Sequence, residues 1–167
     1  MADASELIAR MDRWLASNRP DYYALLQPGA TDAELDAFEA RLSLKLPVAF
    51  RQLYRWRNGQ DPGSSNPLQF NRTFSMLEEV ASAKEELDSM IGFDFEDPEY
   101  WRRGWVPFLH NGAGSYLCLD LAAEDGGQVE LIAFWKRDQD RPIEHPSVEA
   151  WIAALVISME NGSLELA

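Results

Sequence analysis

Apolar residues recur at helical spacing along much of the chain, with polar residues between them. The first such stripe predicts an amphipathic helix over residues 5–17 and consists of Leu7, Ile8, Met11, Trp14 and Leu15. Similar stripes predict four more helices, which are expected to begin near Thr31, Pro47, Ser75 and Ser147. The helical period therefore covers both ends of the chain.

Residues that commonly occupy helix ends mark these boundaries. The segments 31–34 (TDAE) and 75–78 (SMLE) each match a capping box, in which Ser or Thr and a later Glu satisfy free N–H groups. Leu46 precedes Pro47, and proline suits the first turn of a helix. Asn58 and Gly59 are expected to close that helix, with Asn58 helping to cap it and Gly59 in the left-handed conformation.

Between Trp105 and Trp135, apolar residues recur at every second position instead of at helical spacing, which indicates β-strands. Turn-forming residues at Asn111-Gly112 and Gly126-Gly127 separate three runs, so the sequence predicts an antiparallel meander of strands 105–109, 115–121 and 129–135. Leu117 and Leu119 fall on one face of the middle strand, and Tyr116, Cys118 and Asp120 fall on the other.

Three smaller expectations concern the same region. Pro107 lacks an N–H group and is therefore expected near a strand end or on an edge. Asp120 is expected to be an exposed or turn-bonding carboxylate. Residues 68–74 could form an additional strand, whereas residues 136–146 are expected to be a polar loop.

These elements predict the α+β fold class, with residues 1–167 forming a single domain. A central antiparallel sheet flanked by helices is expected, and a mixed sheet is left open as an alternative. The expected core residues are Leu53, Leu117, Leu119, Ile132, Phe134, Trp151 and Leu155.

Composition limits the compartments and partners that fit the chain. Its 167 residues and 46% hydrophobic content suit a globular domain, and a lone cysteine suits a reducing cytoplasm. No signal peptide or apolar run of membrane-spanning length is apparent, so a cytoplasmic protein without a membrane partner is expected. The net charge of −13 makes bare nucleic acid an unsuitable ligand, because phosphate binding needs Lys and Arg.

The negative charge is concentrated in one segment. Residues 1–60 are balanced, whereas residues 78–99 contain nine acidic residues against Lys84 alone, a net charge of −8. Such a surface would attract a basic protein, although a solvated helix face is the simpler interpretation. Tyr100 and Trp101 are considered as aromatic anchors beside it, while other tryptophans are expected in the core. The candidate partner-binding residues are Glu78, Glu79, Glu85, Glu86, Asp88, Asp94, Glu96, Asp97, Glu99, Tyr100 and Trp101.

A set of short motifs, in this order and spacing, resembles the SUKH superfamily over roughly residues 31–157. The residues that carry the resemblance are Leu46, Pro47, Phe50, Tyr54, Asn58, Gly59, Trp105-Val106-Pro107-Phe108, Gly112-Ala113-Gly114-Ser115, Leu117-Cys118-Leu119-Asp120 and Gly126-Gly127-Gln128-Val129. The superfamily includes the fungal cell-wall assembly regulator and many bacterial immunity proteins. The resemblance implies an α+β domain with helices around a sheet and a protein-binding role. The matched residues are interpreted as structural.

The sequence offers no strong catalytic or metal-binding pattern. Cys118 with His110 could form a nucleophile and base, but Cys118 lies within an apolar strand, where a packed thiol is the usual outcome. Asp94, Glu96 and Asp97 could contact calcium but lack the other residues of an EF-hand loop. No catalytic, cofactor-binding or metal-binding residue is therefore predicted.

Three functions remain in competition. The first is an immunity protein that neutralises a cognate polymorphic toxin, with a basic toxin domain as the partner. The chain lacks the long disordered flanks expected of the fungal regulators, which favours this bacterial branch. The second is a regulatory scaffold linked to cell-wall synthesis, and the third is a hydrolase that uses carboxylates. The identity of the partner and the oligomeric state are left open.

Overall fold

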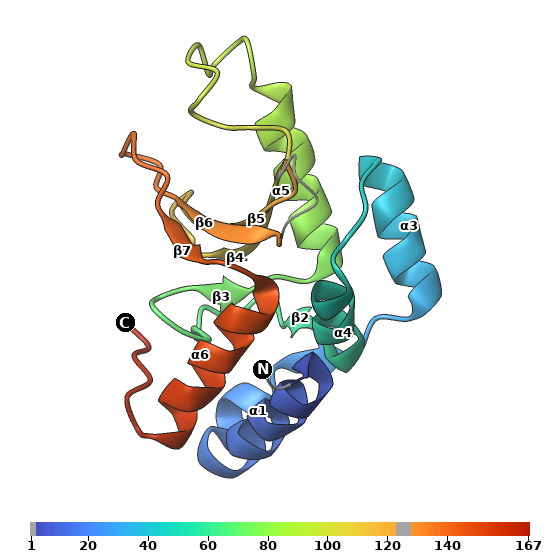
Figure 1. The fold of residues 1–167 in the computed structure, drawn as a ribbon, viewed down its shortest axis with the longest axis vertical. Helices are drawn as coiled ribbons and strands as arrows, with labels where there is room; N and C mark the ends of the chain where they lie inside the picture. The colour runs from blue at the N-terminus through green and yellow to red at the C-terminus, as the bar shows by residue number, and fades with distance from the viewer. Residues whose placement is uncertain (1–2, 123–127) are drawn as a thin grey trace.

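Five antiparallel strands form the central sheet, in the order β3-β4-β5-β6-β7 (Figure 1). The computed structural model describes residues 3–122 and 128–167. The strands are β3 (Thr73–Phe74), β4 (Trp105–His110), β5 (Tyr116–Asp120), β6 (Glu130–Phe134) and β7 (Ile143–His145), and a separate pair joins β1 (Leu26–Pro28) to β2 (Arg57–Gln60). The helices are α1 (Ala4–Asn18), α2 (Pro20–Tyr23), α3 (Asp32–Leu42), α4 (Val48–Trp56), α5 (Leu77–Ser89) and α6 (Val148–Glu160).

This arrangement confirms the α+β fold class, and every strand pair in both sheets is antiparallel. The meander β4-β5-β6 also matches the prediction, with Leu117 opposite Ala133 and Leu119 opposite Leu131. The predicted turn at Gly126 and Gly127 lies outside the described residues. Gly112 has a φ of +77°, in agreement with the turn expected there.

The two faces of the sheet pack against different partners. One face contributes to the main core with α1, α4 and α6, and its side chains include Val106, Phe108, Leu117, Leu119 and Leu131. The other face forms a smaller core, which consists of Trp105, Cys118, Ile132 and Phe134 with Leu87 and Trp101. In Figure 1, α6 and α1 lie on one side of the sheet, and α5 with its following loop lies on the other. The alternation in β5 therefore separates two hydrophobic environments.

The predicted core is confirmed, because all seven residues are buried. Leu119, at 0% exposure, comes from the sheet, and Leu155, also at 0%, comes from the middle of α6. Phe108 connects the two elements by packing edge-on against Trp151, with ring centroids 5.3 Å apart. Their interdigitation excludes water from the interface between helix and sheet.

The five predicted helices begin within two residues of their expected positions, and one predicted capping box differs. Thr31 and Glu34 form the reciprocal capping box of α3, with both hydrogen bonds at 3.1 Å. Ser147 accepts from the backbone of Ala150 at the start of α6. The box predicted for Ser75 and Glu78 is wrong by one residue, because α5 is preceded by Met76, whose N–H donates to Glu79 instead.

Asn58 and Gly59 have roles that differ from those predicted. α4 ends at Trp56, and both residues belong to β2, so Gly59 is not the helix-terminating residue. Two features favour glycine at this position. Its φ is +73°, and a Cβ would lie 2.5 Å from the backbone nitrogen of Met76, because β2 passes close to the chain just before α5. Asn58 does cap a helix, but that helix is α5: its Oδ1 accepts from Leu77 at 2.9 Å.

Pro107 lies in the middle of β4 rather than at its end. β3 covers only Leu109 and His110, so Pro107 lies where that side of β4 has no neighbouring strand. The register to β5 also shifts between Pro107 and Leu109. The missing N–H group is tolerated at this irregular position, but the expected strand-end or edge location is wrong, because Pro107 lies within β4, between β3 and β5 in the sheet order. Asp120 accepts from the backbone of Ala122, as a turn-bonding carboxylate does.

Several short elements were not predicted. Residues 20–23 form α2 and residues 26–28 form β1, although no apolar period predicts either element, and β7 lies within the expected polar loop 136–146. The additional strand predicted over 68–74 is limited to Thr73–Phe74, because Phe70 and Asn71 both have positive φ angles in a turn. These segments are too short to show a period, and pairing with distant strands determines their conformation.

Candidate functional site

The acidic segment 78–99 divides into a neutralised helix and a free loop. On α5, Arg41 of the neighbouring α3 binds two of the candidate carboxylates, Glu78 at 2.8 Å and Glu85 at 2.6 Å. The hydrogen bond from Arg41 lowers the pKa of Glu85 below its usual value. These two residues therefore face a cation of the same molecule, which reduces their attraction for an external partner.

Two further candidates on α5 support the local structure. Asp88 is 3.1 Å from the buried ammonium of Lys84 and accepts from the indole of Trp101 at 2.8 Å. Lys84 also donates to the backbone carbonyl of Arg103. Glu79 accepts from the N–H of Met76 at the helix start. Of the five acidic candidates on α5, only Glu86 is exposed without an ion pair among the described residues.

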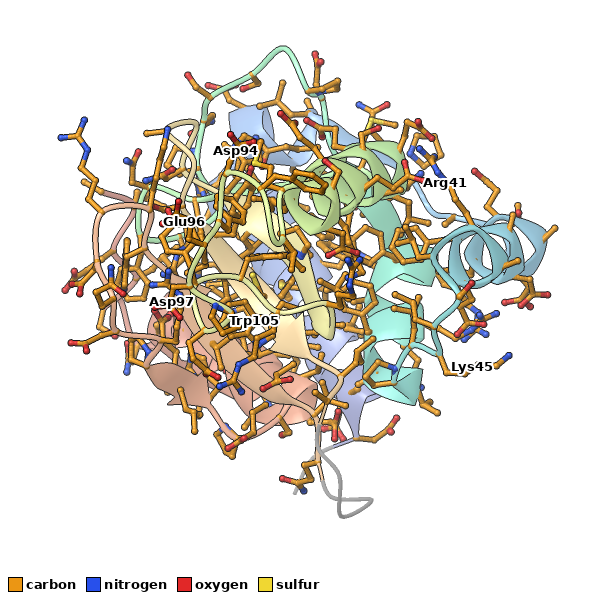
Figure 2. All side chains as sticks on the ribbon, turned by 90° about the horizontal axis from the view of Figure 1, so that it is seen from above. Arg41, Lys45, Asp94, Glu96, Asp97 and Trp105 are labelled. Carbon is orange, nitrogen blue, oxygen red and sulfur yellow. The ribbon has the colours of Figure 1, made fainter. Side chains whose placement is uncertain are left out.

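The loop between α5 and β4 contains the free charge. Asp94, Glu96 and Asp97 are exposed, and no cationic group of the described residues lies within 4.0 Å of their carboxylates. Glu99, the fourth loop acid, pairs with Arg102. Figure 2 shows Asp94, Glu96 and Asp97 on one side of the molecule, well away from Arg41 and Lys45. Their charge is therefore directed to solvent.

An aromatic cluster lies beneath this acidic loop. Phe95 packs on Tyr100 at 4.6 Å between ring centroids, and Tyr100 packs edge-on against Phe134 at 5.2 Å. Trp101 packs against Phe134 and Trp105 and is only 1% exposed. Its indole supports the loop from inside and is not presented to solvent. Tyr100 is half-buried, and its hydroxyl donates to the carbonyl of Lys136 at 2.7 Å.

Arg141 joins the loop to the β6–β7 connection. Its Nε and Nη2 donate to the carbonyl of Tyr100 at 3.1 and 3.0 Å, and its Nη1 donates to the carbonyl of Asp138 at 2.8 Å. The guanidinium also lies over Phe134 and Tyr100, with its Cζ 4.4 and 5.0 Å from the ring centroids. Burial lowers the pKa of Arg141 below its usual value. These contacts attach the end of the loop to the β6–β7 connection.

Phe93 was absent from the sequence candidates, yet it is 80% exposed at the tip of the loop. The exposed acids Asp94, Glu96 and Asp97 follow it in the sequence, so the loop presents an apolar ring near carboxylates that have no ion pair among the described residues. One feature of the sequence could have indicated this exposure: Phe93 lies between Gly92 and Asp94, after the helical spacing of apolar residues has ended. Sequence alone does not distinguish it from Phe95, which turns inward onto Tyr100.

A model of the SMI1 / KNR4 family (SUKH-1) matches residues 29–154. The chain belongs to this family. The SUKH resemblance inferred from the motifs is thereby confirmed.

Three relatives of this SUKH-1 protein cover different shares of it. It is 26% identical to the cell wall biosynthesis/cell cycle regulator smi1 of Schizosaccharomyces pombe, over 95% of the chain and 36% of the relative. It is 24% identical to the KNR4/SMI1 homolog 2 of Debaryomyces hansenii, over 94% of the chain and 35% of the relative. Over 58 residues, 35% of the chain and 13% of the relative, it is 41% identical to the F-box protein SKIP16 of Arabidopsis thaliana. The chain thus spans about a third of the length of both fungal relatives.

Cys118 and His110 do not form a catalytic pair in this SUKH-1 domain. Cys118 is fully buried in the smaller core, and burial raises the pKa of its thiol well above the usual value, so it remains a packed thiol. His110 instead lies 2.8 Å from the hydroxyl of Thr73 on β3. Over residues 3–122 and 128–167, no three His, Cys, Asp or Glu side chains are placed to hold a metal ion. In those ranges, no helix has the length and apolar character needed to cross a membrane.

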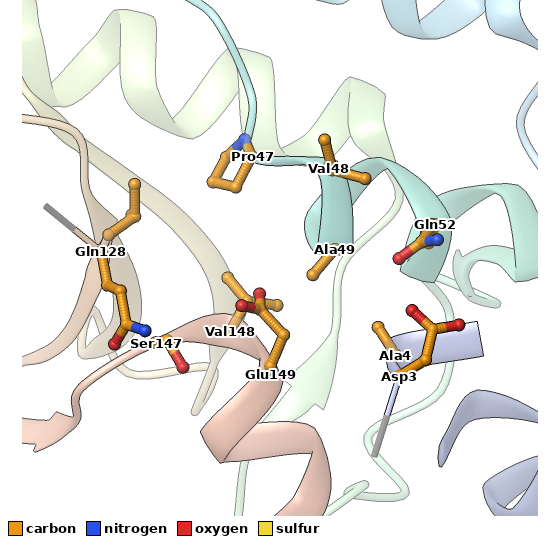
Figure 3. A pocket seen from close by; sticks show the side chains of 11 residues that line it. Asp3, Ala4, Pro47, Val48, Ala49, Gln52, Gln128, Ser147, Val148 and Glu149 are labelled. Carbon is orange, nitrogen blue, oxygen red and sulfur yellow. The ribbon is translucent and has the colours of Figure 1, made fainter. Parts of the chain in front are cut away.

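A separate pocket of about 390 Å³ lies where α1, α4 and α6 begin (Figure 3). Its polar side chains include Asp3, Gln52, Ser147 and Glu149, and the described residues of its lining include no basic residue, histidine or cysteine. Asp3 already caps α1, and Ser147 caps α6. The two carboxylates oppose binding of an anion at the helix N-termini, and the lining lacks a nucleophile with an adjacent base.

Proposed function

We propose that this chain is a non-catalytic protein-binding domain with a regulatory role related to cell-wall synthesis. The observation that carries the proposal is the match to a fission yeast regulator of cell wall biosynthesis and the cell cycle over 95% of the chain. The family match over residues 29–154 supports the same reading. A regulatory domain of this kind acts by binding other proteins through surface loops on a rigid scaffold.

The surface chemistry is consistent with binding rather than catalysis. Asp94, Glu96 and Asp97 in the loop between α5 and β4 are exposed, and Cys118 is enclosed. Glu85 and Glu160 have lowered pKa values because Arg41 and Arg10 donate hydrogen bonds to them, as in ordinary surface ion pairs. A carboxylate hydrolase instead needs a general acid whose pKa is raised by its surroundings.

A chimera in fission yeast tests the regulatory role. The segment of smi1 that matches this chain would be replaced by residues 1–167, and growth would be measured in the presence of a cell-wall-degrading glucanase. The expected result is resistance above that of a strain whose smi1 lacks the segment. A stable, folded chimera that is as sensitive as the deletion would contradict the proposal.

The immunity function stays a prediction with narrower support. None of the three relatives described above is named as an immunity protein, and the supporting observation is the group of free acids on the α5–β4 loop. A toxin encoded next to the gene would provide the test. Co-expression with residues 1–167 should restore growth to cells that produce the toxin, and unchanged killing would count against immunity to that toxin.

A further inference from the structure

The α5–β4 loop, here residues 91–99, has a defined shape despite its exposure. The N–H groups of Phe93 and Phe95 both donate to the carbonyl of Met90, at 3.1 and 3.0 Å, and Gly92 donates to Phe95. Gly92 has a φ of +83°, which lets the chain turn sharply after α5. As a result, Phe95 points inward to Tyr100 while Phe93 stays at the tip.

An exposed phenylalanine in such a place calls for an explanation. Phe93 is 80% exposed, the largest value among the exposed large hydrophobic residues of the described chain. A solvated loop would be equally well formed with a polar residue here, since the ring contributes little burial to the fold. Aromatic residues, phenylalanine included, are enriched at protein–protein interfaces relative to the rest of the surface, so a partner that covers this ring would bury apolar area.

Beside the tip lies a small pocket suited to a cationic side chain. It has a volume of about 260 Å³, and its lining consists of Asp94, Phe95, Glu96, Asp97 and Tyr100. Three of the five lining residues are acidic, and the other two are aromatic. Lysine and arginine bind favourably both to carboxylates and to aromatic faces, particularly where solvent is partly excluded.

We infer that the α5–β4 loop binds a basic segment of a partner protein, with a Lys or Arg side chain in this pocket and a neighbouring apolar side chain on Phe93. The inference rests on the proposed protein-binding function and specifies its contact site and partner chemistry. Charge complementarity selects the occupant, because Glu86, Asp94, Glu96 and Asp97 are exposed without a cationic partner among the described residues. Nucleic acid would be repelled by the same charges.

Because the loop is already ordered, it loses little conformational entropy when it binds a partner. Arg141 and the hydroxyl of Tyr100 attach its end to the β6–β7 connection, so little loop motion is lost on association. The helix face next to it is a weaker candidate, because Arg41 already neutralises Glu78 and Glu85. The contact is therefore assigned to the loop and Glu86 and not to the whole acidic segment.

Synthetic peptides provide a direct probe of this site. The first is a fluorescein-labelled decapeptide with four Lys or Arg residues around a central Trp, the second replaces Trp by Gly, and the third replaces the basic residues by Glu. Binding would be measured by fluorescence anisotropy from 25 to 300 mM NaCl. The first peptide is expected to bind at least fivefold more tightly than the second, with affinity falling as salt rises, and the third should not bind.

Protein variants localise the binding. Phe93→Ala should weaken binding of the first peptide at least fivefold and remove the advantage of Trp over Gly. The triple variant Asp94→Lys, Glu96→Lys and Asp97→Lys should abolish binding and its salt dependence. Matched controls are Ile157→Ala, another exposed apolar residue, and the triple reversal of Glu6, Asp21 and Glu165 to Lys, three exposed acids outside the loop.

Each outcome decides the assignment. Equal binding of the loop variants and their matched controls would overturn it, as would the absence of binding by the wild-type protein. Weaker binding by the charge variant but not by Phe93→Ala would overturn the role of the ring. Failure of these peptides leaves the fission yeast chimera free to succeed, so the contact site and the regulatory function are tested separately. Circular dichroism of every variant would exclude unfolding as the cause.

Discussion

Arg72 and Glu144 provide the sharpest test of how this fold is held together. β3 and β7 are opposite edges of the five-stranded sheet, yet the guanidinium of Arg72, just before β3, reaches the carboxylate of Glu144 in β7. Its two terminal nitrogens donate to the two carboxylate oxygens, both at 2.9 Å. This bidentate ion pair therefore connects the two edges of the sheet, and the guanidinium of Arg72 also lies over the ring of Trp135.

The expected effect follows from burial. The side chain of Arg72 is only 6% exposed and that of Glu144 is 25% exposed, so removing one partner leaves a poorly hydrated charge behind. Breaking a fully buried pair costs about 3–5 kcal/mol, and the partial exposure of Glu144 reduces this to about 2–4 kcal/mol for Arg72→Met. Glu144→Gln keeps one acceptor and should cost about 1–2 kcal/mol. The double variant should be less destabilised than the sum of the single variants.

The same pair predicts a pH dependence. Burial by itself raises the pKa of Glu144, but the hydrogen bond and charge of Arg72 lower it below its usual value. Since the folded-state pKa is the lower one, the pair stabilises the fold fully above the unfolded-state pKa. Its contribution is lost as the pH falls through the folded-state pKa. The stability difference between wild type and Glu144→Gln should therefore be larger at pH 7 than at pH 3.

Urea unfolding monitored by tryptophan fluorescence measures these differences. The control pair is Arg41→Met with Glu85→Gln, an exposed ion pair whose coupling should be much weaker because solvent screens it. If Arg72→Met unfolds at the same urea concentration as wild type, the ion pair between Arg72 and Glu144 does not stabilise the fold. A difference between wild type and Glu144→Gln that does not change with pH would refute the assigned ion pair.

Three further predictions concern the core, a glycine and the acidic segment. Leu119→Ala and Leu155→Ala should each lower stability by about 2–5 kcal/mol, since both side chains are fully buried, and unchanged urea midpoints would contradict their placement. Gly59→Ala should be destabilising by more than about 1 kcal/mol in the same assay, because its Cβ meets the backbone before α5 at a positive φ, whereas Gly112→Ala meets no neighbour and should cost less. Reversal of Glu85, Glu86 and Asp88 to Lys should lower the melting temperature, because it breaks the contacts to Arg41, Lys84 and Trp101. A fully solvated helix face, the simpler interpretation of the sequence, would leave the fold nearly unaffected by this reversal, and a loop reversal of Asp94, Glu96 and Asp97 should have the smaller effect.

Local sequence patterns determined the long helices and the central meander. A stripe of apolar residues at helical spacing has only one face to bury, and the capping residues Thr31 and Ser147 limit where each helix begins. The alternation in 116–120 likewise specified which side chains enter each core. The family resemblance followed from the same regions, because its motifs are boundary and core residues.

Tertiary contacts decided the features that local pattern does not encode. β7 and β1 are three residues each, too short to show a period, and they form because a partner strand satisfies their backbone groups. Trp101 and Phe93 are both aromatic residues near acidic ones, yet one is buried against Phe134 and the other is exposed. Only the folded chain distinguishes them.

The acidic segment shows the same division most clearly. The sequence by itself determined that residues 78–99 contain a large excess of negative charge. The tertiary structure decided which of those charges are available, because Arg41 comes from α3, far away along the chain, to pair with Glu78 and Glu85. Asp94, Glu96 and Asp97 receive no such partner among the described residues. The physical reason is that an ion pair depends on distance in space, which a linear count of charges does not contain.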